Sequence, residues 1–160
     1  GIADRYSFSG EGPLVRVWPR GTVHVKAADH PLEIAMANEQ LLLTGYDLLW
    51  LEEAGGMTLR IALYWQPLAK LDAVYKVSLR LQDASGAPLV DGTGAALTFD
   101  RYPLRQVAPT ITWFPREIVR DIYDLPLQQT DRSAAHTIQI ILYDATTIAE
   151  AGSTQISLLP

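Results

Sequence analysis

Strict alternation between apolar and polar side chains marks three stretches of the chain, residues 57–66, 73–82 and 135–144. In the first stretch, Leu59, Ile61 and Trp65 point one way and Arg60 and Tyr64 point the other. A period of two predicts half-buried β-strands, because successive side chains of a strand face opposite sides of a sheet. We therefore expect Trp65 to lie in the core. A helix over the same residues would carry charged side chains into the core.

Turn-forming sequences separate these stretches. DASGAP (residues 83–88) predicts a tight hairpin in which Gly86 supplies a positive φ, and DGTG (91–94) predicts another break. EEAGG (52–56) joins two long strands, and LEIAMANEQLLL (32–43) could form a short helix, although its flanks favour strands. This spacing predicts an all-β fold, an antiparallel two-sheet sandwich that is jelly-roll-like, with about eight or nine strands.

The chain has the size of one domain. Its 160 residues and 48% apolar content are enough for a core. Residues 1–30 are interpreted as an N-terminal strand segment and linker, or as the tail of a preceding module, and residues 31–160 as the β-sandwich domain. We expect no internal repeat. Because the chain begins at Gly1, we expect it to be a fragment of a longer protein.

Composition removes several functions from consideration. The net charge is −5 and the lysines are scattered, which argues against a nucleic-acid partner. The absence of cysteine excludes disulfides, thiol catalysis and cysteine-bound zinc. No apolar run is long enough to span a membrane, for which about 18 residues are needed. No motif of a metalloprotease, serine hydrolase or nucleotide-binding loop is present.

Four segments of the sequence carry a family resemblance: LTGYDL (residues 43–48), residues 59–92, PTITWFPREIVRDIYDLPL (109–127) and IILYDATT (140–147). Together they resemble a β-sandwich module of bacteria such as the Chloroflexi. That module typically follows the membrane portion of large family-39-like glycosyltransferases, which are similar to dolichyl-phosphate-mannose protein mannosyltransferases. The resemblance covers about residues 40–150. Arg116 and Ile148 stand where the pattern has glycine, and at Arg116 this predicts a different turn geometry.

The resemblance implies a non-catalytic accessory domain, with no catalytic residue to carry over and no cofactor. It implies a location on the extracytoplasmic face of the cell membrane, as part of a larger membrane protein. The ligand expected from this association is a carbohydrate or glycolipid. The alternative is a purely structural or protein-interaction module that packs on its parent protein.

Four outward-facing side chains are the first candidate site. If the strands at 57–66 and 135–144 belong to one sheet, Arg60, Tyr64, Gln139 and Tyr143 share an outer face. Aromatic rings stack on the apolar faces of sugars, and amide or guanidinium groups reach the hydroxyls. The alternative is that the N-terminal segment or the parent protein covers this face.

Trp113 is the second candidate, because it lies between Pro109 and Pro115 in a proline-stiffened loop. It either closes one open end of the sandwich by packing or is exposed and stacks on a sugar ring.

Acidic residues offer two further possibilities. Glu117, Asp121 and Asp124 alternate with Arg116 and Arg120, so surface ion pairs explain them better than a pair of catalytic carboxylates. A hydrogen bond from a backbone N–H or an arginine would give Asp121 a structural role. Loop carboxylates at Asp83 and Asp91 could bind calcium, but turn formation accounts for both, so no metal site is predicted.

Overall fold

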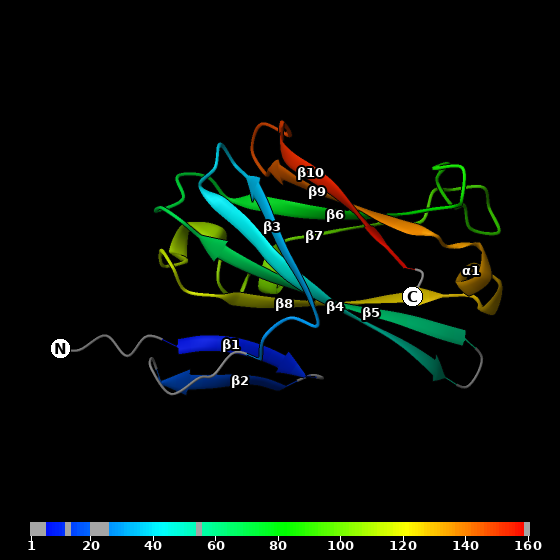
Figure 1. The fold of residues 1–160 in the computed structure, drawn as a ribbon, viewed down its shortest axis with the longest axis horizontal. Helices are drawn as coiled ribbons and strands as arrows, with labels where there is room; N and C mark the ends of the chain where they lie inside the picture. The colour runs from blue at the N-terminus through cyan, green and yellow to red at the C-terminus, as the bar shows by residue number, and fades with distance from the viewer. Residues whose placement is uncertain (1–5, 12–13, 20–25, 54–55, 159–160) are drawn as a thin grey trace.

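The protein is a sandwich of two four-stranded antiparallel sheets (Figure 1). The computed structural model describes residues 6–11, 14–19, 26–53 and 56–158, with side chains described for residues 26–52 and 56–158. The first sheet has the order β3-β4-β5-β8 and comprises β3 (His30–Met36), β4 (Leu41–Glu53), β5 (Gly56–Pro67) and β8 (Val119–Leu127). The second has the order β10-β9-β6-β7 and comprises β10 (Glu150–Ser157), β9 (Thr137–Asp144), β6 (Tyr75–Gln82) and β7 (Thr98–Arg101). The predicted all-β two-sheet sandwich is confirmed.

Smaller elements complete the chain. Strands β1 (Tyr6–Glu11) and β2 (Leu14–Pro19) pair with each other as a separate two-stranded sheet, and β1 lies against β8. Short helical turns occur at η1 (Pro103–Gln106), η2 (Thr110–Thr112) and α1 (Gln129–Ala134). Within the described part of the chain, no helix is long and apolar enough to cross a membrane. Whether residues 1–30 belong to a preceding module stays a prediction.

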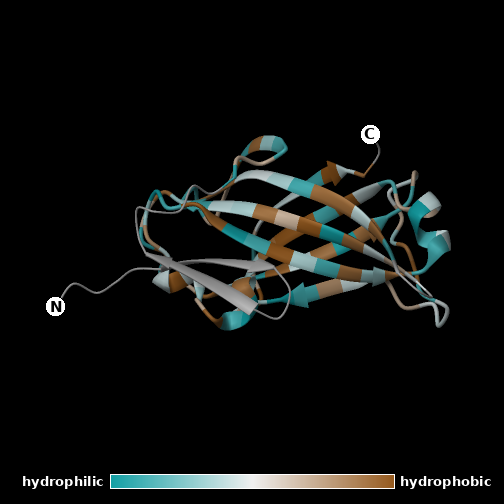
Figure 2. Cartoon of the chain, turned by 90° about the horizontal axis from the view of Figure 1, so that it is seen from below, coloured by the Kyte–Doolittle hydropathy of each residue, from teal (hydrophilic) through white to brown (hydrophobic). Residues whose placement is uncertain are grey.

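The core lies between the two sheets, where alternate residues of each strand meet. Leu59, Ile61 and Trp65 on β5 are fully buried, and Ile138 and Ile140 on β9 face them from the other sheet. Figure 2 shows the resulting alternation of hydrophobic and hydrophilic bands along the strands. Burial of this apolar surface, worth roughly 25 cal/mol per Å², is the main force that holds the sheets together. The predicted core position of Trp65 is confirmed.

Two consecutive hairpins between β6 and β7 form a repeat that was not predicted. The sequences LQDASGAP (residues 81–88) and LVDGTGAA (89–96) share the pattern Leu-x-Asp-x-Ser/Thr-Gly-Ala. In each, the aspartate N–H donates to the carbonyl of the alanine four residues later, and Gly86 and Gly94 have φ values of 83° and 85°. The expectation that the chain has no internal repeat is therefore wrong. The tight turn at residues 83–88 is confirmed.

The two positions at which the sequence lacks an expected glycine have left-handed backbones. Arg116 has a φ of 69° and Ile148 a φ of 61°. Glycine adopts such angles without steric cost, whereas other residues rarely do. The expectation of a different turn geometry at Arg116 does not hold, because the backbone there has the conformation that a glycine would take.

The two open sides of the sandwich differ. On one side β3 and β10 are the edge strands, and the N–H of Ala37 donates to the carbonyl of Ala151 at 2.7 Å. Gly152 packs so closely there that an added Cβ would lie 2.7 Å from Cγ of Met36. On the other side β7 and β8 are the edge strands. There the side chain of Arg101 on β7 reaches across to β8.

Candidate functional site

The structure separates the four residues that were expected to share one face. Arg60 and Tyr64 lie on β5 in the first sheet, whereas Gln139 and Tyr143 lie on β9 in the second sheet. Because each side chain points away from the core, the two pairs are on opposite outer surfaces of the sandwich. The predicted single platform is therefore wrong. Pattern alone identified which residues point outward but could not assign strands to sheets.

Tyr64 is enclosed, although it lies on an outer face. Its side chain is only 2% exposed. Its hydroxyl donates to Oδ2 of Asp47 at 2.7 Å and accepts a hydrogen bond from Nε of Arg120 at 2.9 Å. Burial, followed by the hydrogen bond to Asp47, raises the pKa of the Tyr64 hydroxyl. A tyrosine held in this way has a structural role and offers no ring face to a ligand.

The same cluster fastens the segment that precedes β3. The backbone N–H of Asp29 donates to Oδ1 of Asp47 at 2.7 Å, and Lys26 Nζ lies 3.6 Å from Oδ2. Tyr46 stacks on His30 with ring centroids 4.7 Å apart. Gly45 allows the close approach, because an added Cβ would lie 2.8 Å from the carbonyl oxygen of His30. The LTGYDL sequence thus anchors the entering chain to the first sheet.

Arg60 is committed to an ion pair. Its Nε and Nη2 atoms donate to the two carboxylate oxygens of Asp124 at 2.6 and 3.0 Å. This bidentate hydrogen bonding by Arg60 is the main reason that the pKa of Asp124 is lowered. Neither Arg60 nor Tyr64 is therefore arranged as part of an open binding face.

Trp113 lies in the core, where 5% of its surface is exposed. Its Nε1 donates to the carbonyl oxygen of Ala108 at 2.9 Å. The packing interpretation is confirmed, and the alternative in which Trp113 is exposed to stack on a sugar is wrong. Thr110, in the same loop, accepts from the N–H of Tyr75 and donates to the carbonyl of Ala73, which ties the loop to the start of β6.

Asp121 is buried between the sheets, with 1% of its surface exposed. Its Oδ1 accepts hydrogen bonds from Arg101 at 2.8 Å and from the N–H of Leu104 at 3.0 Å. Burial raises its pKa, and the Arg101 charge opposes that shift. The expected structural role is confirmed, but the expected surface pairing with Arg116 or Arg120 is wrong for this residue.

The outer face of the second sheet carries a further set of outward polar groups. Tyr143 on β9 pairs with Lys76 on β6, and Gln139 pairs with Arg80 two rows further along the same face, beyond the pair of Ser78 and Ile141. The Lys76 ammonium lies 4.9 Å from the ring centroid of Tyr102 and 5.7 Å from that of Tyr143. Pattern analysis missed Lys76, Arg80 and Tyr102 as site residues. Only the strand order reveals that they surround Gln139 and Tyr143.

This face extends onto the edge strand β10. Gln155 pairs with Gln139 across the strands, and its Nε2 donates to Oε1 of Gln82 at 3.0 Å. Oε1 of Gln82 also accepts from the hydroxyl of Thr137 at 3.1 Å. The face therefore offers amide, hydroxyl, ammonium and guanidinium groups beside two half-exposed rings, with the buried pair of Ser78 and Ile141 between the two polar rows.

The structure contains no prepared metal site among its described residues, because no three acidic or histidine side chains gather there. Oδ1 of Asp83 accepts from the N–H and hydroxyl of Ser85, and Oδ1 of Asp91 accepts from the same groups of Thr93. These bonds lower the pKa of both carboxyls. Turn formation thus accounts for both carboxylates.

Comparison of the chain with protein-family models, with curated proteins and with solved structures finds no match in any of the three. Function therefore has to be argued from the geometry of the surface.

Proposed function

We propose that this chain is a non-catalytic accessory β-sandwich domain that binds carbohydrate on the outer face of its second sheet. The observation that carries the proposal is the cluster of Tyr143, Lys76 and Tyr102, with the pair of Gln139 and Arg80 two rows further along the same face. Sugar rings have apolar faces that pack on aromatic rings, and their hydroxyls exchange hydrogen bonds with amides and accept hydrogen bonds from ammonium and guanidinium groups. A strand face with both kinds of group suits an extended glycan.

The opposite face supports a second candidate, a structural or protein-interaction module. Leu49 on β4 is an exposed apolar side chain on the outer face of the first sheet. Leu49 shares its row with the ion pair of Arg60 and Asp124. The segment before β3 is also fixed to this sheet through Asp47. Such a face suits packing on the remainder of a larger protein.

The setting proposed for either function rests on the family resemblance. The domain would belong to a membrane glycosyltransferase-like protein and lie on the extracytoplasmic face of the cell membrane. A glycan or the carbohydrate part of a glycolipid would be the ligand in that setting. The resembling segments supply mainly structural contacts, such as those of Gly45, Asp47 and Asp121, so they do not by themselves mark a ligand site.

The test is a titration of the isotope-labelled protein with soluble oligosaccharides of glucose, mannose, xylose and N-acetylglucosamine, followed by amide NMR shifts. We expect shifts over residues 76–80 and 137–143, and we expect Tyr143→Ala or Gln139→Ala to weaken binding about fivefold or more. Gln66→Ala is the matched control, since Gln66 is a half-exposed glutamine on the outer face of the first sheet. No shifts with any glycan would favour the interaction module, which Leu49→Glu would then disrupt in the parent protein.

A further inference from the structure

A hollow of about 370 Å³ lies on the open side of the sandwich, between the edge strands β7 and β8. Small-molecule sites in proteins usually measure about 300–1,000 Å³, so this hollow has room for a small ligand. On the other open side, between β3 and β10, Gly152 lies close against Met36.

One wall of the hollow is rigid. The guanidinium of Arg101 lies 3.6 Å from the ring centroid of Tyr123 and donates to Asp121 at 2.8 Å. It also donates to the backbone carbonyl oxygens of Tyr102 and Ile122. Because these N–H donors are bonded to acceptors within the protein, Arg101 has a structural role: it forms a wall of the hollow and links the two sheets.

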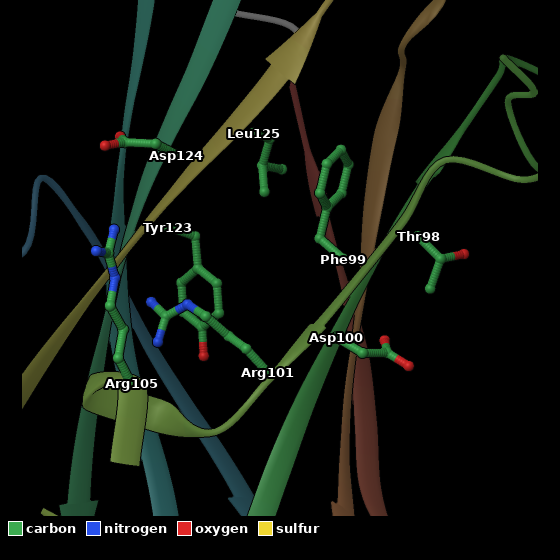
Figure 3. A pocket seen from close by; sticks show the side chains of 8 residues that line it. All are labelled: Thr98, Phe99, Asp100, Arg101, Arg105, Tyr123, Asp124 and Leu125. Carbon is green, nitrogen blue, oxygen red and sulfur yellow. The ribbon is translucent and has the colours of Figure 1, made fainter. Parts of the chain in front are cut away.

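Apolar groups form the neighbouring surface. Figure 3 shows the side chains of Phe99 and Leu125 close together beside the Arg101–Tyr123 stack. Phe99 is partly exposed, whereas Leu125 is buried behind it. A flat apolar group entering the hollow would therefore contact the ring of Phe99, which Leu125 supports from behind.

Arg105 stands at the mouth on a strained turn. Leu104, Arg105 and Gln106 are consecutive non-glycine residues with φ values of 50°, 51° and 65°. The left-handed conformation costs roughly 1–2 kcal/mol for such residues, and strained backbone of this kind is concentrated at ligand-binding sites. The N–H of Leu104 donates to the buried carboxylate of Asp121. A core residue thus holds the turn that presents Arg105.

Hydrogen-bond donors and acceptors meet at this mouth. Figure 3 shows the Arg105 side chain extending from its turn toward Asp124. The Arg105 charge contributes to the lowered pKa of Asp124, whose hydrogen-bond partner is Arg60. Two arginines and two aspartates line the hollow, so its charges balance. A balanced set favours a neutral ligand over an anion or a cation.

We propose that the hollow between β7 and β8 binds a single neutral sugar residue. The apolar face of the sugar would pack on Phe99, and its hydroxyls would accept from Arg105 and donate to Asp124. This site is separate from the outer face of the second sheet, so it goes beyond the proposed function and does not depend on it.

The test uses NMR titration of the whole chain with methyl β-glucoside, methyl α-mannoside and glucuronate. We expect at least one neutral glycoside to shift amides of residues 99–106 and 122–125. Arg105→Gly removes the guanidinium and keeps the left-handed backbone, and we expect it to weaken this binding about fivefold, the effect of one lost hydrogen bond. Arg116→Gly is the matched control, because Arg116 is also an exposed arginine with a positive φ.

The possible results separate this site from the sheet face. Glycoside shifts in the hollow that survive Tyr143→Ala and weaken in Arg105→Gly support the proposal. Equal affinities of the Arg105→Gly and Arg116→Gly proteins would overturn it, as would shifts with glucuronate alone or no shifts in the hollow. Oligosaccharide shifts on the second sheet with none in the hollow would reject this inference and leave the proposed function standing.

Discussion

The guanidinium of Arg101 and the carboxylate of Asp121 join the two sheets across an open side of the sandwich, with 2.8 Å between Nη2 and Oδ1. Asp121 is almost completely buried, whereas Arg101 is about a quarter exposed, with 24% of its side chain accessible. The pair also supports the turn at Leu104, which accounts for its position next to the hollow. Loss of either partner should therefore affect both stability and the shape of that side.

Arg101→Met should lower the free energy of unfolding by about 2–4 kcal/mol at neutral pH, because it leaves a buried carboxylate without its cation. The Asp121 pKa is already raised by burial, and loss of Arg101 raises it further. A raised native pKa means that the native state binds the proton more tightly, so stability falls as the pH rises through that pKa. Urea unfolding should show a smaller penalty at pH 4.5 than at pH 7. Equal penalties at the two pH values would contradict this account.

Ser85→Ala should raise the pKa of Asp83 toward 3.8, the usual value for aspartate. The Ser85 hydroxyl makes the largest contribution to the lowered pKa of this carboxyl, and it donates to Oδ1 at 2.7 Å. A lowered native pKa stabilises the fold above pH 3.8, and the stabilisation disappears as the pH falls through the native pKa. Carboxyl-carbon NMR titration measures the change. Asp91, in the second copy of the turn, is the internal control and should keep its midpoint.

Ile148→Gly should stabilise the protein by about 0.5–1 kcal/mol, because it relieves a left-handed backbone at a β-branched residue. The side chain is 68% exposed, so its removal loses little packing. Ile111→Gly is the matched control, because Ile111 is also exposed but has no positive φ. That control should lose stability, as glycine adds flexibility to the unfolded chain. Thermal unfolding of the two variants should shift in opposite directions.

The sandwich was predictable because the sequence of each strand shows, without reference to its neighbours, which of its side chains face the core. Leu59, Ile61 and Trp65 alternate with polar residues, and that period is independent of which strands become neighbours. The turns were predictable for the same reason, because a glycine such as Gly86 marks a positive φ from the local sequence alone. The repeat at Leu81 and Leu89 was also visible in the sequence, as an eight-residue spacing of Leu-x-Asp.

The candidate sites were less predictable because they depend on which strands become neighbours. Tyr64 and Tyr143 have the same outward phase, but β5 and β9 lie in different sheets. The burial of Asp121 follows from its pairing with Arg101, which lies 20 residues earlier on the other sheet. The ring of Tyr102 reaches Lys76 only because β7 pairs with β6. The alternation of apolar and polar residues within a single strand carries no information about these pairings between strands.

Gly45→Ala should destabilise the protein by about 1–3 kcal/mol, the usual cost of overpacking. The new Cβ would lie 2.4 Å from Cβ of Ala28 and 2.8 Å from the carbonyl oxygen of His30. Because the second contact is with backbone, the entering segment would have to move. Gly92→Ala is the control, since an added Cβ there has nothing within 4 Å. Similar unfolding midpoints for the two variants would show that the segment is not held against Gly45.

Tyr64→Phe should lower the free energy of unfolding by about 1–2 kcal/mol, because it removes the hydrogen bond from the Tyr64 hydroxyl to Oδ2 of Asp47. The Tyr64 hydroxyl lies 2.7 Å from Oδ2 of Asp47, whereas Arg120 Nη2 lies 3.6 Å from the same oxygen. The effect should be local as well as global. The amide of Asp29 donates to Oδ1 of Asp47, so its hydrogen exchange should become faster when the carboxylate is less well held.

Tyr143→Phe provides the comparison for Tyr64→Phe, because Tyr143 is a half-exposed tyrosine on the outer face of the other sheet. That variant should change stability by no more than about 0.5 kcal/mol and leave exchange at Asp29 unaltered. If Tyr64→Phe also leaves the Asp29 amide protected, the carboxylate of Asp47 is positioned by Lys26 and Arg120 alone. The tyrosine would then contribute packing rather than a hydrogen bond to the anchoring of the entering chain.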